Sequence, residues 1–144
     1  MAEAGEQSCV FCKIANGKDE NAELLFQDEA YAVFRDHKPA ASTHLLVVPK
    51  AHISDAKSLK KQDLELVTTM VKIGEQVLQE HGGEVTKARF GFHWPPFCLI
   101  YHLHLHVIHP VSEAGFISRQ IFKPNSLWFV TPDWLMDRLN KMPS

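Results

Sequence analysis

The chain has 144 residues, of which 45% are apolar and 22% charged, a composition typical of a soluble globular protein. Its formal net charge of −2 gives no general attraction to nucleic acid, and no apolar run approaches the ~20 residues that span a membrane. Nine histidines are the one unusual feature of the composition.

The N-terminal residues and the cysteines indicate the cellular compartment of the protein. Residues 1–6 are small and acidic and lack the basic and apolar regions of a secretory signal. The chain has an odd number of cysteines (Cys9, Cys12 and Cys98), which is a poor basis for a disulfide framework. We therefore expect a cytoplasmic or nuclear protein. Residues 1–8 are expected to be a disordered tail, and residues 9–144 a single domain.

The first half of the chain predicts a short helix, three strands and a long helix. Apolar residues fall at helical spacing over 10–14, and strands are predicted at 23–27, 31–35 and 44–48. A long amphipathic helix is predicted over 59–80, with Ser58 as its N-cap and Gly82-Gly83 as its end.

The second half predicts shorter elements. In chain order these are strands at 88–93, 102–108 and 126–130, and a final helix opened by Thr131-Pro132. Strands of mixed spacing around one long helix indicate an α+β domain.

Between His102 and Val107 histidines and apolar residues alternate, which is the period of a half-buried strand. His102, His104 and His106 then share one face, spaced roughly 6.5–7 Å apart, and the apolar residues between them face the core. Such a face suits metal binding, phosphate binding or nucleophilic attack, because neutral imidazole is a nitrogen nucleophile near pH 7. The central His104 has a histidine on each side and is best placed to attack.

The run His102-Leu103-His104-Leu105-His106-Val107-Ile108 resembles the His-φ-His-φ-His-φ-φ signature of the histidine triad (HIT) superfamily. The similarity covers nearly the whole chain and includes residues 9–14, 34–36 and 44–52. Residues 91–97 and the Trp128-Phe129 tail are most similar to the adenosine 5′-monophosphoramidase branch, with aprataxin a nearby relative. The resemblance implies a HIT-like fold, in which an antiparallel sheet carries one long central helix and a short C-terminal helix.

The same resemblance implies a hydrolase that cleaves the P–N bond of adenosine 5′-phosphoramidates and releases AMP through a nucleotidyl-histidine intermediate. AMP-lysine, AMP-amine and acyl-AMP are the expected substrates. His104 would attack the α-phosphorus and His106 would donate to a non-bridging oxygen. His102 and His44 would orient His104 and fix its tautomer.

The resemblance also implies a nucleotide site beside the triad. Asp36 would accept hydrogen bonds from the ribose hydroxyls, since an ionised carboxylate is an acceptor only. His37 would touch the nucleotide through its backbone, and His93 would lie near the phosphate. An apolar slot for adenine would consist of Val10, Phe11, Ile14 and Phe34.

Leu99 departs from the pattern of the superfamily. Relatives commonly carry a small hydroxyl residue three positions before the first histidine of the triad, and leucine has no donor. We therefore expect a lower rate or a shifted substrate preference.

No cofactor is required for the expected chemistry, but some members of the superfamily hold structural zinc. The residues that match their ligands are Cys9, Cys12, His52 and His102, and two sulfurs with two nitrogens suit tetrahedral zinc. The alternative is a pair of thiols without a metal.

Three other functions stay open. An aprataxin-like DNA 5′-adenylate hydrolase is disfavoured, because the chain has no excess positive charge and no cysteine after Cys98 for a zinc finger. The others are a dinucleoside polyphosphate hydrolase and a nucleotide- or zinc-binding module without turnover. Adenylated small molecules or lysines are the expected partners, together with a second copy of the chain. Trp128 and Trp134 are candidate interface anchors, or core residues.

Overall fold

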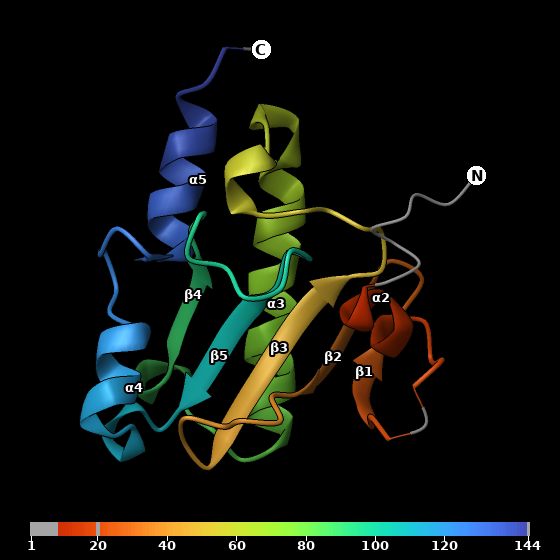
Figure 1. Ribbon diagram of the computed structural model, residues 1–144, viewed down its shortest axis with the longest axis vertical. Helices are drawn as coiled ribbons and strands as arrows, with labels where there is room; N and C mark the ends of the chain where they lie inside the picture. Colours follow the sequence, from red (N-terminus) through yellow and green to blue (C-terminus); the bar gives the residue numbers. More distant parts are fainter. Residues whose placement is uncertain (1–8, 20, 144) are drawn as a thin grey trace.

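The structure is a computed structural model that describes residues 9–19 and 21–143, and the tail expected at residues 1–8 lies outside them. A six-stranded antiparallel sheet forms its centre, in the order β1-β2-β3-β5-β4-β6 (Figure 1). The strands are β1 (Leu24–Gln27), β2 (Tyr31–Arg35), β3 (Thr43–Pro49), β4 (Arg89–His93), β5 (Leu105–His109) and β6 (Phe129–Val130). The α-helices are α2 (Val10–Ala15), α3 (Leu64–Glu80), α4 (Phe116–Ile121) and α5 (Pro132–Asn140). The predicted α+β class is confirmed.

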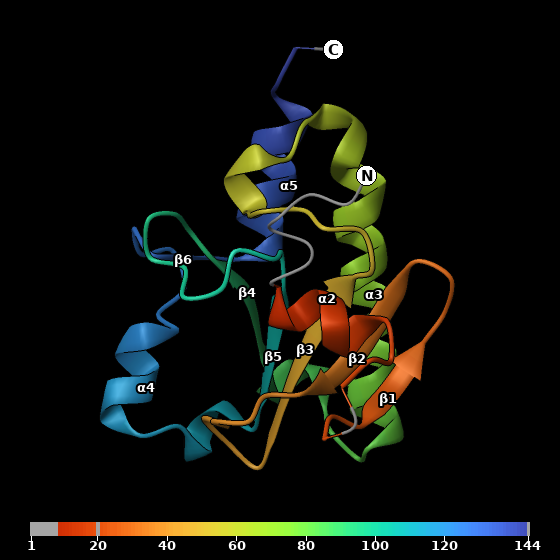
Figure 2. The same cartoon turned by 45° about the vertical axis from the view of Figure 1, so that its right-hand side comes forward.

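The two faces of the sheet carry separate apolar clusters. Helix α3 lies behind the sheet in Figure 1, and α5 lies beside α3. Helix α2 covers part of the opposite face of the sheet, as the turned view in Figure 2 shows. Strand β3 divides its side chains between the two faces, because Leu45 and Val47 pack with α3 while Leu46 and Val48 pack with α2. The face that carries α2 also carries the histidines described below.

The long helix begins later than predicted. Helix α3 starts at Leu64, and two short 3₁₀ helices, η1 (Ala56–Ser58) and η2 (Lys61–Asp63), precede it. Ser58 is therefore not an N-cap of α3: its backbone N–H donates to Asp55, which caps η1. Lys60 is extended and donates its N–H to Asp63. Local side-chain to backbone bonds thus replace the first turn of the expected helix. Its predicted end is confirmed, since Gly82 has a φ of 82°.

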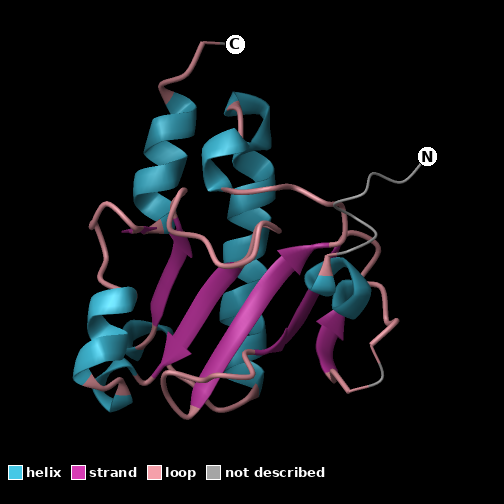
Figure 3. Cartoon of the chain, viewed as in Figure 1, coloured by secondary structure: helices cyan, strands magenta, loops and turns pink. Residues whose placement is uncertain are grey.

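The histidine strand is shorter than predicted. Strand β5 begins at Leu105, so residues 102–104 precede its ladder (Figure 3). The predicted core positions are confirmed, because Leu103, Leu105 and Val107 all pack in the cluster under α3. The late strand is also shorter, because β6 contains only Phe129 and Val130.

Helix α4 is an element that the hydrophobic pattern did not predict. Its six residues include the exposed Phe116 and Ile117, so it has no buried apolar face to generate a helical period. Thr131 is the N-cap of α5, as predicted, since its hydroxyl accepts from the backbone N–H of Trp134. Within the described residues no helix is long and apolar enough to cross a membrane.

Candidate active site

His104 is held with a defined nitrogen facing outward. Its Nδ1 lies 2.7 Å from the carbonyl oxygen of His102, which only accepts, so Nδ1 carries the proton and Nε2 keeps its lone pair. Burial lowers the pKa of His104 to about 4, and the ring is therefore neutral at pH 7. A neutral imidazole with a free Nε2 lone pair is a competent nucleophile.

A chain of hydrogen bonds leads to His106. The backbone N–H of Ala40 donates to Nδ1 of His44 over 2.9 Å, so the proton of His44 is on Nε2. The Nε2–H of His44 donates to Nδ1 of His106, and the two nitrogens are 2.9 Å apart. His106 in turn must carry its proton on Nε2. Burial lowers the pKa of both rings and keeps them neutral.

The Nε2–H of His106 is a buried donor that has no partner within the described part of the chain. Leaving such a donor unpaired costs on the order of 1–3 kcal/mol, so its retention calls for an acceptor that the protein itself does not supply. The His106 ring lies 4.9 Å from that of His104. A nucleophilic lone pair and an unused N–H donor are thus side by side.

Asp36 lies at the end of β2, next to the hydrogen-bonded pair of His44 and His106. Its Oδ2 is 3.4 Å from Nε2 of His44, and its Oδ1 accepts from the backbone N–H of Lys38. The carboxylate side chain is 16% exposed and so can still reach a ligand. The side chain of His37 is 83% exposed and lies outside the cluster.

His93 joins the cluster from β4. A ring nitrogen of each of His93, His104 and His106 lies within 4.8 Å of the others. The Nε2 of His93 is 3.3 Å from the carbonyl oxygen of Ile121, to which it donates, and burial lowers its pKa.

Phe122, at the end of α4, is a site residue that the sequence did not reveal. Its ring lies 4.9–5.3 Å from the rings of His44, His93 and His106. It thereby covers the histidine cluster with apolar surface and strengthens the electrostatic interactions beneath it. A single phenylalanine in a segment without a clear period gives no signal for this position.

The residues expected to hold adenine lie on the α2 side of the site. The ring of Phe11 is edge-on to those of Phe34 and His104, at 5.3 and 5.0 Å. Phe11 and Phe34 are buried, whereas Ile14 is half-buried and Val10 is exposed. Phe11, Ile14 and Phe34 also belong to the apolar cluster under α2, so they serve the core as well.

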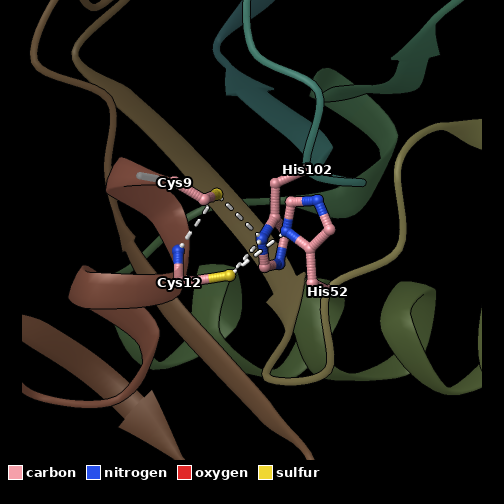
Figure 4. A group of neighbouring side chains, drawn as sticks. All are labelled: Cys9, Cys12, His52 and His102. Carbon is pink, nitrogen blue, oxygen red and sulfur yellow. Dashed lines mark hydrogen bonds between the residues drawn. The ribbon is translucent and has the colours of Figure 1, made fainter. Parts of the chain in front are cut away.

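The side chain of His102 points away from this site into a second cluster with Cys9, Cys12 and His52 (Figure 4). Its Nε2–H donates to the carbonyl oxygen of Pro49 over 2.7 Å, which leaves the Nδ1 lone pair facing the two sulfurs at 3.3 Å each. Nδ1 of His52 lies 3.2 Å from Sγ of Cys12. Two sulfurs and two imidazole nitrogens that converge in this way could hold a metal ion, and tetrahedral zinc prefers such donors, with the Pro49 carbonyl as outer support.

The structure therefore gives His44 and His102 contacts that differ from those the sequence predicts. His44 contacts His106 and not His104. His102 does hold His104, but through its backbone carbonyl, while its side chain belongs to the second cluster. Because the strand ladder begins only at Leu105, residue 102 is free to turn its ring toward α2.

The sequence matches known proteins over most of its length. It matches the family described as "Scavenger mRNA decapping enzyme C-term binding" over residues 8–122. A protein of Xenopus tropicalis named adenosine 5′-monophosphoramidase HINT3 is 47% identical over 135 residues, which are 93% of this chain and 88% of that protein. The chain belongs to the histidine triad family. Aprataxins are among its further relatives.

Solved structures of histidine triad proteins agree with the fold. A HIT family hydrolase from Legionella pneumophila is 34% identical, with a TM-score of 0.65, and the match covers 70% of this chain and 91% of that one. A zinc-bound histidine triad family protein from Mycobacterium smegmatis is 25% identical, with a TM-score of 0.57, over 72% of this chain and 75% of that one. The predicted HIT-like fold is confirmed.

Proposed function

We propose that this histidine triad protein hydrolyses the P–N bond of adenosine 5′-phosphoramidates and releases AMP. One observation carries the proposal: the neutral His104 presents a free Nε2 lone pair beside the unpaired Nε2–H of His106. The name of the Xenopus relative, adenosine 5′-monophosphoramidase, supports the choice of substrate.

The reaction has two steps. Nε2 of His104 attacks the α-phosphorus, the P–N bond breaks, and the amine takes up one proton from solvent as it leaves. Water then attacks the phosphorus of the nucleotidyl-histidine, gives up one proton to solvent, and frees AMP and neutral His104. The Nε2–H of His106 donates to the non-bridging oxygen where negative charge grows, and it is already oriented by His44 and the Ala40 N–H.

We assign the remaining side chains to substrate binding. Asp36 accepts from the ribose hydroxyls, and His37 contributes only its backbone. Adenine lies against Phe11, Ile14 and Phe34, with Val10 at the rim. His93 lies beside the phosphate, where its nitrogen is within 4.8 Å of those of His104 and His106.

The test is AMP release from a synthetic AMP-amine conjugate. Wild-type protein should release AMP, and His104→Asn should abolish the release while binding of AMP persists. Parallel assays with 5′-adenylated DNA and a dinucleoside polyphosphate separate the alternative hydrolases. A wild type that binds AMP but turns over no adenylated substrate contradicts the enzymatic proposal in favour of a binding module.

Leu99 bears on the rate of this reaction. Its side chain is 99% exposed, so a serine there should leave stability within about 0.5 kcal/mol of the wild type. If the missing hydroxyl slows departure of the amine, Leu99→Ser should raise kcat for poorly leaving amines about fivefold, the worth of one hydrogen bond of ~1 kcal/mol. An unchanged kcat would remove Leu99 from the account.

We propose zinc as the ion that the Cys9–Cys12–His52–His102 cluster holds, in a structural role. The convergence of four suitable donor atoms supports it, as does the zinc-bound relative from Mycobacterium. Metal analysis of protein purified without added zinc should give about one equivalent per chain, and Cys12→Ser should lose it. Cys98→Ser is the matched control, because Cys98 lies outside the cluster. Less than a tenth of an equivalent in the wild type excludes the site.

We further propose that two copies of the chain associate. Large apolar side chains are exposed at Leu99, Phe116, Ile117 and Leu127, and Trp134 is 41% exposed, as expected of interface anchors. Light scattering should give a dimer mass at micromolar concentration, and a monomer mass contradicts the proposal.

A cytoplasmic or nuclear location remains our proposal on the grounds of the cysteines. The cluster needs its thiols reduced to bind metal, which a reducing compartment ensures. Fractionation of cells followed by immunodetection tests it.

A further inference from the structure

We infer that the Cys–His cluster (Cys9, Cys12, His52 and His102) positions the nucleophile: by fixing His102, it sets the orientation and the tautomer of His104. The inference rests on the proposed function and on the proposed zinc. It makes His102 and His52 positioning residues, which act through His104 and do not touch the substrate.

The backbone around the nucleophile lacks the support of the sheet. Strand β5 begins at Leu105, and so the ladder with β3 does not hold residues 102–104. The backbone N–H of Leu103 donates to the carbonyl oxygen of Ile53 over 2.6 Å. Ile53 directly follows the cluster residue His52, so the loop that carries one cluster ligand also holds the backbone next to the nucleophile.

His102 is fixed through both of its ring nitrogens. Nε2–H donates to the Pro49 carbonyl oxygen, and Nδ1 faces Sγ of Cys9 and of Cys12 at 3.3 Å. The residue is completely buried. Its carbonyl oxygen, 2.7 Å from Nδ1 of His104, is the acceptor that keeps the proton off the attacking nitrogen. Any motion that the His102 ring gains therefore displaces this carbonyl oxygen and, with it, the ring of His104.

The same cluster anchors the apolar wall beside His104. Cys9 and Cys12 bracket the first turn of α2, which also carries Phe11. The Phe11 ring is edge-on to His104, with centroids 5.0 Å apart. A cluster with all its ligands in place thus constrains His104 both through the carbonyl below it and through the ring beside it.

The expected size of the effect is large for a remote group. Displacing a reacting atom by about 1 Å can cost roughly 100-fold in rate, and loss of outer support of a site typically costs about 10- to 100-fold. Without the acceptor carbonyl in place, the two neutral tautomers of His104 mix, and only the Nδ1–H form has the attacking lone pair on Nε2.

The experiment uses His52→Gln, because no ring contact of His52 within the described residues reaches His104 or Phe11. His81→Gln is the matched control, since His81 is an exposed histidine at the end of α3. Four quantities are measured in protein incubated with zinc and freed of the excess: zinc content, the tautomer of His104 from two-bond ¹H–¹⁵N correlation spectra, and kcat and KM for an AMP-amine conjugate.

We expect His52→Gln to lose zinc, to show a mixture of His104 tautomers, and to lower kcat about 10- to 100-fold with KM changed less than threefold. His81→Gln should match the wild type. A chelator added to the wild type should mix the tautomers in the same way, and zinc should restore the single form; this arm decides the question if the variant does not fold.

A His104 tautomer that is unchanged by chelation and by His52→Gln overturns the inference, and so does a wild type that binds no zinc. The spectra are read without turnover, and so the two proposals fail separately. A tautomer shift in a protein without phosphoramidase activity would contradict the proposed function alone.

Discussion

At the scale of single residues, the site depends on which nitrogen of each histidine carries a proton. The Ala40 N–H and the His102 carbonyl are backbone groups with fixed roles, and each determines one tautomer. From these two groups the donor on His106 and the lone pair on His104 follow without any charged imidazole. The protein therefore prepares attack and charge stabilisation with neutral rings in a buried site.

His106→Ala tests the donor. It should lower kcat about 10²- to 10³-fold, the usual cost of losing one donor to a developing oxyanion, with little change in affinity for AMP. Steady-state kinetics and calorimetric titration with AMP measure the two effects. His109→Gln is the control, because His109 lies on the same strand but accepts from the backbone N–H of Glu84 and does not belong to the group of His93, His104 and His106. A loss of less than threefold would show that the donor is not used.

At the scale of elements, β4 and β6 tie the histidine cluster to the rest of the sheet. A Cβ placed on Gly91 would overlap the ring of Phe129 and lie 2.9 Å from the carbonyl oxygen of Val130. Phe129 in turn packs against His93 and Phe122, at 5.0 and 5.5 Å. Gly91 is thus required by close packing and not by its backbone conformation.

Gly91→Ala should destabilise the fold by about 1–3 kcal/mol, because the ring of Phe129 must move, and it should also lower kcat through His93 and Phe122. Urea unfolding and the phosphoramidase assay measure the two effects. The comparison variant is Gly115→Ala, where a Cβ meets no atom within 4 Å. Equal stability of the two variants would refute the packing argument.

The sequence predicted most of these elements because periodicity reports burial. The alternation at residues 102–107 identified the correct core residues, and the cap at Thr131 identified the last helix. Alternation does not report where a ladder of hydrogen bonds begins, however. The strand was therefore predicted to start at residue 102, and the different direction of the His102 ring was missed.

The missed parts of the site depend on tertiary packing and on loop geometry. The donation from Ala40 to His44, the bond between His44 and His106 and the cover by Phe122 each join residues by tertiary packing or by loop geometry. No local pattern encodes them. The grouping of Cys9, Cys12, His52 and His102 was predicted through family resemblance, and the structure brings the four together.

At the scale of the whole molecule, burial of several neutral histidines makes stability depend on pH. Burial lowers the pKa of His44, His93 and His106 below the ordinary value near 6.5. Below pH 6.5 the unfolded chain binds protons that the folded chain does not, so the free energy of unfolding falls as the pH falls.

Each such histidine contributes a loss of at most about 1.4 kcal/mol per pH unit, starting near pH 6.5 and ending at its lowered pKa. Urea unfolding at pH 8.0, 7.5, 6.5, 5.5 and 5.0 should therefore show constant stability above pH 7 and a steep decline below 6.5. A free energy of unfolding that stays constant down to pH 5 would contradict the assignment of buried neutral rings.

The central claim is that Nε2 of His104 forms a bond to phosphorus. Wild-type protein mixed with a slight excess of an AMP-amine conjugate and quenched within milliseconds should contain AMP covalently bound to the peptide that carries His104, as mass spectrometry detects. His104→Asn should contain none, although it still binds AMP. Rapid release of AMP by the wild type with no covalent adduct at any time would contradict the account, because water would then attack the substrate directly.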